Sequence, residues 1–293
     1  MKHSDHGRYP YRSIQDRKDY SWPDGRRLAI YIGVNYEVFD FTEGLGAKLS
    51  PSQTSPDVLN TGWRDYGNRV GAWRLFDLFD DLDLRTTALL NSDVIQRCPG
   101  LAEACRDRGD ELAAHGRTNA EAQGDMDRER ESAMIADVTK AIETLGRKPT
   151  GWLGPWISES HETPELLVEH GYRYVLDWAH DDQPTRLRTA AGRLLSVPYS
   201  QEINDLPAIV GRHQEAEAFS AMIAAAVDQL LLESSRRPAV LGIALHPYIM
   251  GQAHRVPALA GVLKRIRGGG DPRIWWTTAG AIAEHVESID AAV

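Results

Sequence analysis

The sequence predicts an α/β fold in which parallel strands close into a single barrel. Short apolar runs alternate with stretches of helical periodicity along the chain, as expected when each strand is followed by a crossover helix. There are roughly seven or eight such strand–helix units, which favours a barrel over an open sheet. The length of 293 residues and the 42% apolar content suit one large barrel with a sizeable core.

The predicted strands are short and almost continuously apolar, which is typical of parallel strands buried on both faces. The runs at 28–34 (LAIYIGV) and 239–245 (AVLGIAL) are the clearest. Weaker runs predict further strands at 85–90, 111–114, 150–153, 172–176, 194–197 and 274–276.

The predicted helices fill the intervals, and some have recognisable ends. The helix at 127–145 stops at Gly146, and Thr163-Pro164 combines an N-cap with a proline in the first turn. Because no linker or repeat interrupts the pattern, residues 1–293 are expected to form one domain, with 1–21 as an N-terminal extension. The other helices are predicted at 70–82, 101–108, 163–171, 216–232, 256–266 and after Thr277 or Thr278.

Charge and composition exclude several classes of function. The formal net charge is −9, and the chain has no run of Lys or Arg, so nucleic acid and anionic membrane surfaces are not expected partners. No apolar segment approaches the roughly 18 residues that span a bilayer, and the N-terminus is polar, so a cytoplasmic location is expected. Cys98 and Cys105 are too few for a disulfide framework.

Titratable side chains stand directly after several predicted strands: Glu37, His115, Asp177 and His246. Since the C-terminal ends of parallel strands meet at one face of a barrel, these four residues are expected to surround one cavity. Each alone has an ordinary explanation as a loop, turn or cap residue. Together they supply groups suited to acid–base catalysis and predict an active site.

The stretches around these residues resemble the polysaccharide deacetylase (NodB-homology) family, and within it the branch that contains an allantoinase. The resemblance extends from about residue 22 to 282. It implies a distorted (β/α)7 barrel and hydrolysis of an amide carbon–nitrogen bond. It is carried by VNYEVFDF (34–41), YGNRVGAWRLFDLFD (66–80), AAHGRTN (113–119), the stretch 151–178, SVPYSQEIND (196–205) and ALHPYIMGQAHR (244–255).

The resemblance also implies a metal site, which this sequence matches only in part. The family binds its metal through a carboxylate and two histidines. His115 matches the first histidine, but Asn119 replaces the second and Val38 stands at the carboxylate. A catalytic zinc needs about three protein ligands, so no cofactor is expected, and zinc stays an alternative. A register shift of one residue would place Glu37 on the metal, but Asn119 would still leave the ligand set incomplete.

The resemblance implies roles for the titratable residues. Glu37 falls on the general base, His246 on the late histidine that protonates the leaving nitrogen, and Asp177 on the partner of that histidine. A carboxylate in this position fixes the imidazole tautomer and stabilises the imidazolium. His115, or backbone N–H groups at a helix start, would receive the oxyanion. Leu153 replaces the arginine of the family's Arg-x-Pro motif.

The expected substrate is a small amide such as a cyclic ureide or imide, because a cytoplasmic enzyme would not meet extracellular glycans. Two alternatives stay open: a metal-dependent deacetylase of an N-acetylated sugar, and a catalytically silent binding protein on the same barrel. The family's intracellular amide hydrolases imply a homodimer or homotetramer. The residues expected to contact the substrate are Tyr66, Arg69, Asn119, Trp152, Pro155, Trp178 and Arg255.

Overall fold

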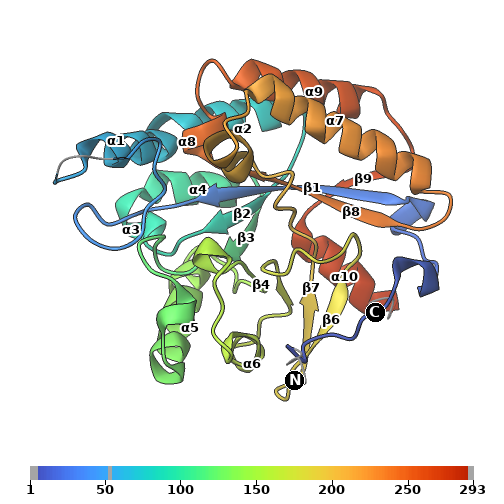
Figure 1. Ribbon diagram of the computed structural model, residues 1–293, viewed down its shortest axis with the longest axis horizontal. Helices are drawn as coiled ribbons and strands as arrows, with labels where there is room; N and C mark the ends of the chain where they lie inside the picture. Colours follow the sequence, from blue (N-terminus) through green and yellow to red (C-terminus); the bar gives the residue numbers. More distant parts are fainter. Residues whose placement is uncertain (1–5, 52–54, 290–293) are drawn as a thin grey trace, which may run out of the picture.

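The strands form one curled sheet, and helices cover its outer side (Figure 1). The structure is a computed structural model that describes residues 6–51 and 55–289; residues 1–5 of the predicted N-terminal extension and 290–293 lie outside the described part. The strands are β1 (Leu28–Tyr36), β2 (Thr87–Leu90), β3 (Glu111–Ala114), β4 (Gly151–Trp152), β5 (Tyr174–Val175), β6 (Thr185–Arg188), β7 (Arg193–Ser196), β8 (Ala239–Leu245) and β9 (Ile274–Thr277).

The strand order is that of an incompletely closed barrel. The nine-stranded sheet runs β6-β7-β5-β4-β3-β2-β1-β8, with β9 beside β1. The neighbouring strands pair in parallel, apart from the antiparallel β6–β7 hairpin. Between β7 and β8, an isolated bridge joins Asn204 to Ala244. This arrangement confirms the predicted distorted (β/α) barrel.

β1 is the central strand, and every residue in it is buried. It pairs with β8 from Leu28 to Val34, with β9 at its beginning and with β2 at its end. The strand is two residues longer than the predicted 28–34, so Asn35 belongs to it. Glu37 therefore follows directly on a strand that is held on both sides.

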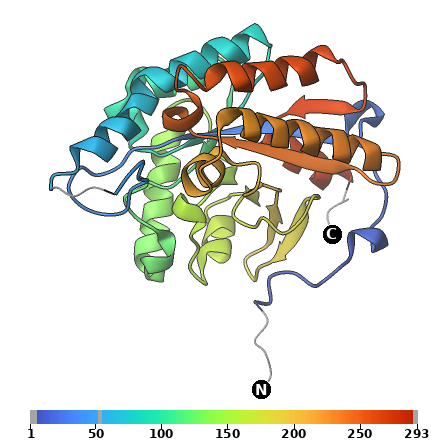
Figure 2. The ribbon, with the colours of Figure 1, turned by 45° about the horizontal axis from the view of Figure 1, so that its top comes forward.

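Helices lie on the outside of the curled sheet. α7 and α9 lie side by side over β8 and β1 (Figures 1 and 2). α10 packs its apolar side chains into the interior of the barrel, together with Ala29 and Tyr31. The helices are α1 (Val58–Tyr66), α2 (Ala72–Asp81), α3 (Val94–Arg97), α4 (Pro99–Asp107), α5 (Arg128–Glu143), α6 (Thr163–Glu169), α7 (Ala216–Glu233), α8 (Pro247–Met250), α9 (Val256–Gly268) and α10 (Ala279–Ile289).

Four elements differ from the sequence-based expectation. α1 and the short α3 and α8 had no predicted counterpart, and neither had the edge strand β6. α1 contains Gly62, and the residues it buries are the polar Asn60 and Arg64, so no run of apolar core residues marks it in the sequence. β6 reads TRLR, with its arginines more exposed than Thr185 and Leu187, as expected of an edge strand. The predicted helix at 70–82 is preceded by a π-helical turn at Gly67–Gly71.

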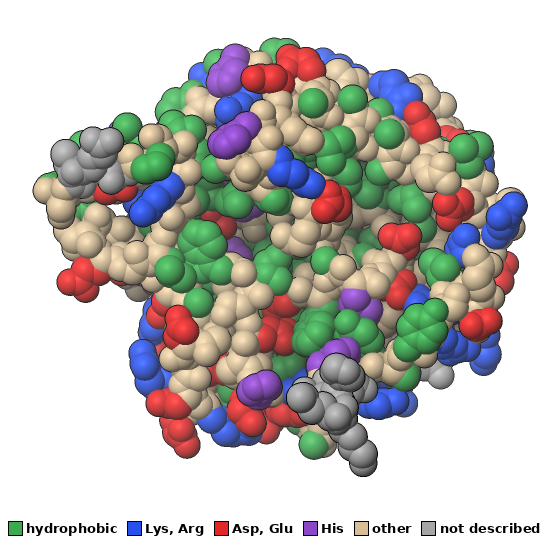
Figure 3. All heavy atoms as spheres, viewed as in Figure 1, with side chains coloured by type: hydrophobic (Ala, Val, Ile, Leu, Met, Phe, Trp, Pro, Cys, Tyr) green, Lys and Arg blue, Asp and Glu red, His purple; other side chains and the backbone are tan. Residues whose placement is uncertain are grey.

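The surface carries both signs of charge. On the face in Figure 3, acidic, basic and apolar side chains are interspersed, and no basic patch dominates that face. Among the helices that the structure describes, none combines the length and apolarity needed to cross a membrane.

Candidate active site

Strand alternation decides which side chains face the barrel interior. On β1, Ala29 and Tyr31 belong to the interior cluster, whereas the alternate residues Leu28, Ile30 and Ile32 belong to the outer core. The same period of two places Glu37 on the interior side and buries Val38 in the outer core. Glu37, and not Val38, is therefore the residue after β1 whose side chain reaches the cavity.

Glu37, His115 and His246 meet in one cavity of about 150 Å³. The Glu37 Oε1 atom lies 3.3 Å from His115 Nε2 and 3.6 Å from His246 Nε2. All three side chains are almost completely buried. The cavity is lined by Asn35, Glu37, His115, Asn119, Leu153, Trp156, Ile157, Tyr199, Gln201, Asn204, Leu206, Pro207, His246 and Tyr248.

A backbone carbonyl fixes the tautomer of His115. Its Nδ1 lies 2.8 Å from the Leu153 carbonyl oxygen, which can only accept a hydrogen bond. Nδ1 therefore carries a proton that it donates to this carbonyl, and Nε2 faces Glu37 Oε1 at 3.3 Å. The residue that replaces the family's arginine thus orients the histidine through its main chain.

A chain of side-chain amides fixes the orientation of Asn119. The backbone N–H of Val38 donates to Asn91 Oδ1 at 2.9 Å, so the other end of that amide is nitrogen. Asn91 Nδ2 donates to Asn119 Oδ1 at 3.0 Å, and Asn119 Nδ2 then donates to Glu37 Oε1 at 2.6 Å. Asn119 therefore points an N–H group, not an oxygen, at the Glu37 carboxylate.

The carboxylate partner of His246 is Asp205. Its Oδ1 lies 2.6 Å from His246 Nδ1, and its Oδ2 accepts the His246 backbone N–H at 2.8 Å. Asp205 is fully buried at the start of the π-helical turn Leu206–Gly211. The bond fixes the histidine tautomer with Nε2 directed toward Glu37.

The structure places Asp177 elsewhere, which corrects the pairing expected from the sequence. Tyr174 and Leu176 belong to the interior cluster, so Asp177 falls on the other side of the chain. Its Oδ1 accepts the Gly154 N–H at 2.7 Å. Burial, followed by the nearby Glu159, raises the pKa of Asp177 well above its usual value. Asp177 therefore braces the loop after β4 and does not contact His246.

The electrostatics of the cavity favour an ion pair. Burial alone would lower the pKa of His246, but the carboxylates of Asp205 and Glu37 outweigh it and raise the pKa to about 10. Burial alone would raise the pKa of Glu37, but His246 and His115 outweigh it and lower the pKa to about 2. At neutral pH the cavity thus holds a carboxylate beside an imidazolium, and the separated pKa values suggest a base and an acid.

Three hydrogen-bonding residues that line the cavity, Tyr248, Asn35 and Tyr199, had been assigned no role from the sequence. Tyr248 donates its hydroxyl to Glu37 Oε2 at 2.7 Å. Asn35 donates to the Tyr199 hydroxyl oxygen at 2.9 Å. The signal that would have found Asn35 and Tyr248 is the period of two, since each lies two residues from a predicted catalytic residue.

Of the residues expected to contact the substrate, Asn119 lines the cavity. Trp152 points to the outer core, where its Nε1 donates to Gln123 at 2.9 Å. Trp178 donates to Glu159 at 3.0 Å, and Arg255 donates to a main-chain carbonyl at 3.3 Å. These side chains support loops and helices around the barrel.

The other expected contact residues also lie outside the cavity lining. The Tyr66 hydroxyl accepts a hydrogen bond from Arg74, Arg69 is exposed on the π-helical turn, and Pro155 is buried at the start of a short 3₁₀ turn. The next residue, Trp156, lines the cavity instead. It is 38% exposed, has a φ of 62° and donates to the Asn119 carbonyl at 3.0 Å.

The donor set does not fit the metal site of the family. Glu37 Oε1 and His115 Nε2 are suitable ligands, but Asn119 presents N–H and the Val38 side chain is buried in the outer core. His246 is held protonated by its carboxylate neighbours. Within the described ranges, no group of three His, Cys, Asp or Glu side chains is placed to hold a metal ion. A zinc ion needs about three ligands, and the arrangement supplies two.

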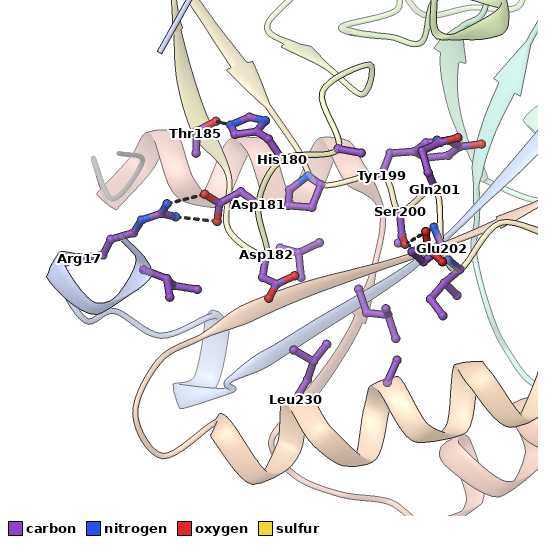
Figure 4. Close-up of a pocket in the computed structure, with 18 of the residues that line it drawn as sticks. Arg17, His180, Asp181, Asp182, Thr185, Tyr199, Ser200, Gln201, Glu202 and Leu230 are labelled. Carbon is purple, nitrogen blue, oxygen red and sulfur yellow. Dashed lines mark hydrogen bonds and ion pairs between the residues drawn. The ribbon is translucent and has the colours of Figure 1, made fainter. Parts of the chain in front are cut away.

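A second, larger cavity of about 970 Å³ lies behind the wall formed by Tyr199 and Gln201, which line both cavities. The N-terminal segment borders it, anchored by an ion pair between Arg17 and Asp181 (Figure 4). Its lining contains none of the three residues that meet around Glu37 Oε1. The smaller cavity is therefore the candidate active site.

Comparison with known sequences shows a similarity to one family. The polysaccharide deacetylase family matches residues 63–175. The chain is 27% identical to the peptidoglycan deacetylase of Helicobacter pylori over 153 residues, which is 52% of each chain, so the match spans about half the length of that relative. The part of the chain from residue 63 to residue 175 is therefore similar to the polysaccharide deacetylase family.

Solved structures share the fold over nearly the whole chain. A "probable polysaccharide deacetylase" of Pseudomonas aeruginosa PAO1 is 25% identical, with a TM-score of 0.81 and coverage of 91% of this chain and 93% of that one. PuuE allantoinase is 24% identical, with a TM-score of 0.86 and coverage of 97% and 99%. The likeness to the allantoinase shows a common fold.

Proposed function

We propose that this hydrolase cleaves an amide bond in a small uncharged molecule, such as a cyclic ureide or imide, by acid–base catalysis without a metal. The observation that carries this proposal is the Glu37–His246 ion pair in the 150 Å³ cavity. Amide hydrolysis requires an activated water, a stabilised oxyanion and a protonated leaving nitrogen. The cavity offers candidates for the first and third of these from its own side chains.

Glu37 acts as the base. Its Oε1 takes a proton from a water molecule as the water oxygen bonds to the carbonyl carbon. Its low pKa in the resting ion pair keeps it charged, so it can accept a proton from water. Tyr248 and Asn119 hold the two carboxylate oxygens in place.

His246 acts as the acid. Its Nε2 donates a proton to the leaving nitrogen as the carbon–nitrogen bond breaks, and Asp205 stabilises the imidazolium beforehand. Glu37 then carries the proton taken from water, and His246 is neutral. Return of that proton across the 3.6 Å between Oε1 and Nε2 restores the resting state.

The lining of the cavity supports a neutral substrate rich in hydrogen-bonding groups. Among the polar side chains of the lining, amides and hydroxyls outnumber the titratable Glu and His residues, and none of the described lining residues is Lys or Arg. A carboxylate or phosphate substrate would lack a cationic partner outside the catalytic pair. A ureide or imide ring presents several carbonyl and N–H groups in a small volume, and the allantoinase fold supports the same class.

The alternative substrate is an N-acetylated sugar, favoured by the 27% identity to a peptidoglycan deacetylase. The test is a screen of chelator-treated protein against ureides, hydantoins, imides and N-acetyl sugars, with and without zinc. We expect hydrolysis of a cyclic amide without zinc. Activity restricted to N-acetyl sugars and dependent on zinc would establish the alternative. A homodimer or homotetramer is part of the proposal, and light scattering tests it.

A further inference from the structure

The catalytic cavity still requires a donor for the oxyanion, and the expected donor, His115, does not suit this role. Its Nδ1 proton is donated to the Leu153 carbonyl, and its Nε2 faces Glu37 Oε1 at 3.3 Å, so neither nitrogen is free to bind the oxyanion. The hydroxyl of Tyr248 and the amide of Asn119 are committed to Glu37. We propose that Tyr199 donates its hydroxyl proton to the carbonyl oxygen of the scissile amide, an inference that rests on the proposed function.

The orientation of Asn35 determines the direction of the Tyr199 hydrogen bond. Asn35 Nδ2 lies 3.1 Å from the Leu245 carbonyl oxygen, which only accepts, so this end of the amide is nitrogen. The same nitrogen lies 2.9 Å from the Tyr199 hydroxyl oxygen. Since an amide nitrogen has no lone pair to offer, Tyr199 accepts here and its own proton remains available.

The position of Tyr199 directs that proton into the catalytic cavity. Leu195, Val197 and Tyr199 alternate toward the barrel interior, and the Tyr199 side chain is buried and lines the cavity. Within the described part of the chain, no carbonyl or side chain accepts its proton. Burial raises the pKa of Tyr199 well above its usual value, so the hydroxyl stays protonated.

The link through Asn35 places the donor close to the base. Asn35 and Glu37 are two residues apart on β1 and the segment after it, so they face the same side. A buried, oriented hydroxyl stabilises developing negative charge more strongly than one in water. Gln201 and Asn204 line the same cavity and would serve a second carbonyl of a ureide or imide.

The test compares Tyr199→Phe with Tyr31→Phe. Tyr31 is also buried, and its hydroxyl donates to the Pro198 carbonyl at 2.7 Å, but it does not line the catalytic cavity. We expect Tyr199→Phe to lower kcat by about 10²–10³-fold, the usual effect of removing one oxyanion donor. KM and the melting temperature should change no more than in the Tyr31 variant.

A second variant keeps the ring and the hydroxyl. Site-specific 3-fluorotyrosine at position 199 makes the donated proton more acidic, so a tetrahedral anionic inhibitor should bind more tightly than to the natural protein. If the natural protein hydrolyses a small amide but Tyr199→Phe keeps its kcat, or the fluorinated variant binds the inhibitor no better, Tyr199 is not the donor. If the natural protein hydrolyses none of the amides, the proposed function itself fails.

Discussion

Asp205 holds both the ring and the main chain of His246: its Oδ1 is 2.6 Å from Nδ1, and its Oδ2 accepts the backbone N–H at 2.8 Å. This double contact positions the imidazole between Asp205 and Glu37. Both carboxylates raise the pKa of His246 to about 10 against the opposing effect of burial. The acid of the proposed reaction is therefore charged throughout the neutral range.

The pH dependence of kcat/KM follows from these charges. His246 must be protonated, so activity is expected to persist through neutral pH and to fall as pH rises toward about 10. Asp205→Asn removes one of the two stabilising carboxylates, so the alkaline limb should move to lower pH. Asp177→Asn is the matched control, because Asp177 bonds to Gly154, and the limb should not move. A shift in the Asp177 variant alone would restore the pairing expected from the sequence.

Removal of either proton-transfer group should lower kcat severely. We expect Glu37→Gln and His246→Ala each to lower kcat by about 10²–10⁴-fold, because a positioned acid or base has this effect. In the double variant, kcat should fall by much less than the product of the two single-variant factors, since both groups act in one proton cycle. Steady-state kinetics with the best cyclic amide measures this. Full activity in both single variants would place the active site elsewhere.

The π-helical turn at Gly67–Gly71 is expected to position Tyr248. A Cβ at Gly67 would lie 2.6 Å from the Tyr248 backbone nitrogen, so Gly67→Ala should displace the residue that donates to Glu37. We expect a loss of about 1–3 kcal/mol in unfolding free energy, as for other overpacked sites, together with a lower kcat.

Gly62→Ala is the control on the preceding helix, because a Cβ there meets nothing within 4 Å. It should leave kcat unchanged and stabilise the protein slightly, by up to about 1 kcal/mol of helix propensity. Denaturant unfolding and kcat of both variants measure this. Equal effects of the two substitutions would contradict the positioning role of Gly67.

The fold was accessible from the sequence because its strands are continuous apolar runs at regular intervals. The Glu37–His115–His246 cluster was accessible for a related reason, since each residue follows such a strand. Asp205 was not recognised as the partner of His246. Several irregular residues separate it from the end of β7, so the alternation of the strand does not predict where its side chain points. The contact role of Trp152 was misjudged because residue type was considered without strand phase, which directs that ring to the outer core.

The position of Asn119 offers a gain-of-function test of the ligand argument. Asn119→His would replace an N–H donor by an imidazole beside Glu37 and His115, which completes three ligands. We expect zinc affinity, measured by calorimetry on chelator-treated protein, to rise well above that of the natural chain. Equal affinities in the two proteins would show that Asn119 does not limit metal binding.

Metal-free turnover tests the central claim most directly. The protein would be treated with a strong chelator, its zinc content measured by elemental analysis, and its rate on the best cyclic amide compared with that of untreated and zinc-supplemented protein. Because Asn119 presents an N–H group and Val38 is apolar, we predict substoichiometric zinc and an unchanged rate. One tightly held zinc per chain, with activity lost on its removal and regained on its return, would contradict the account.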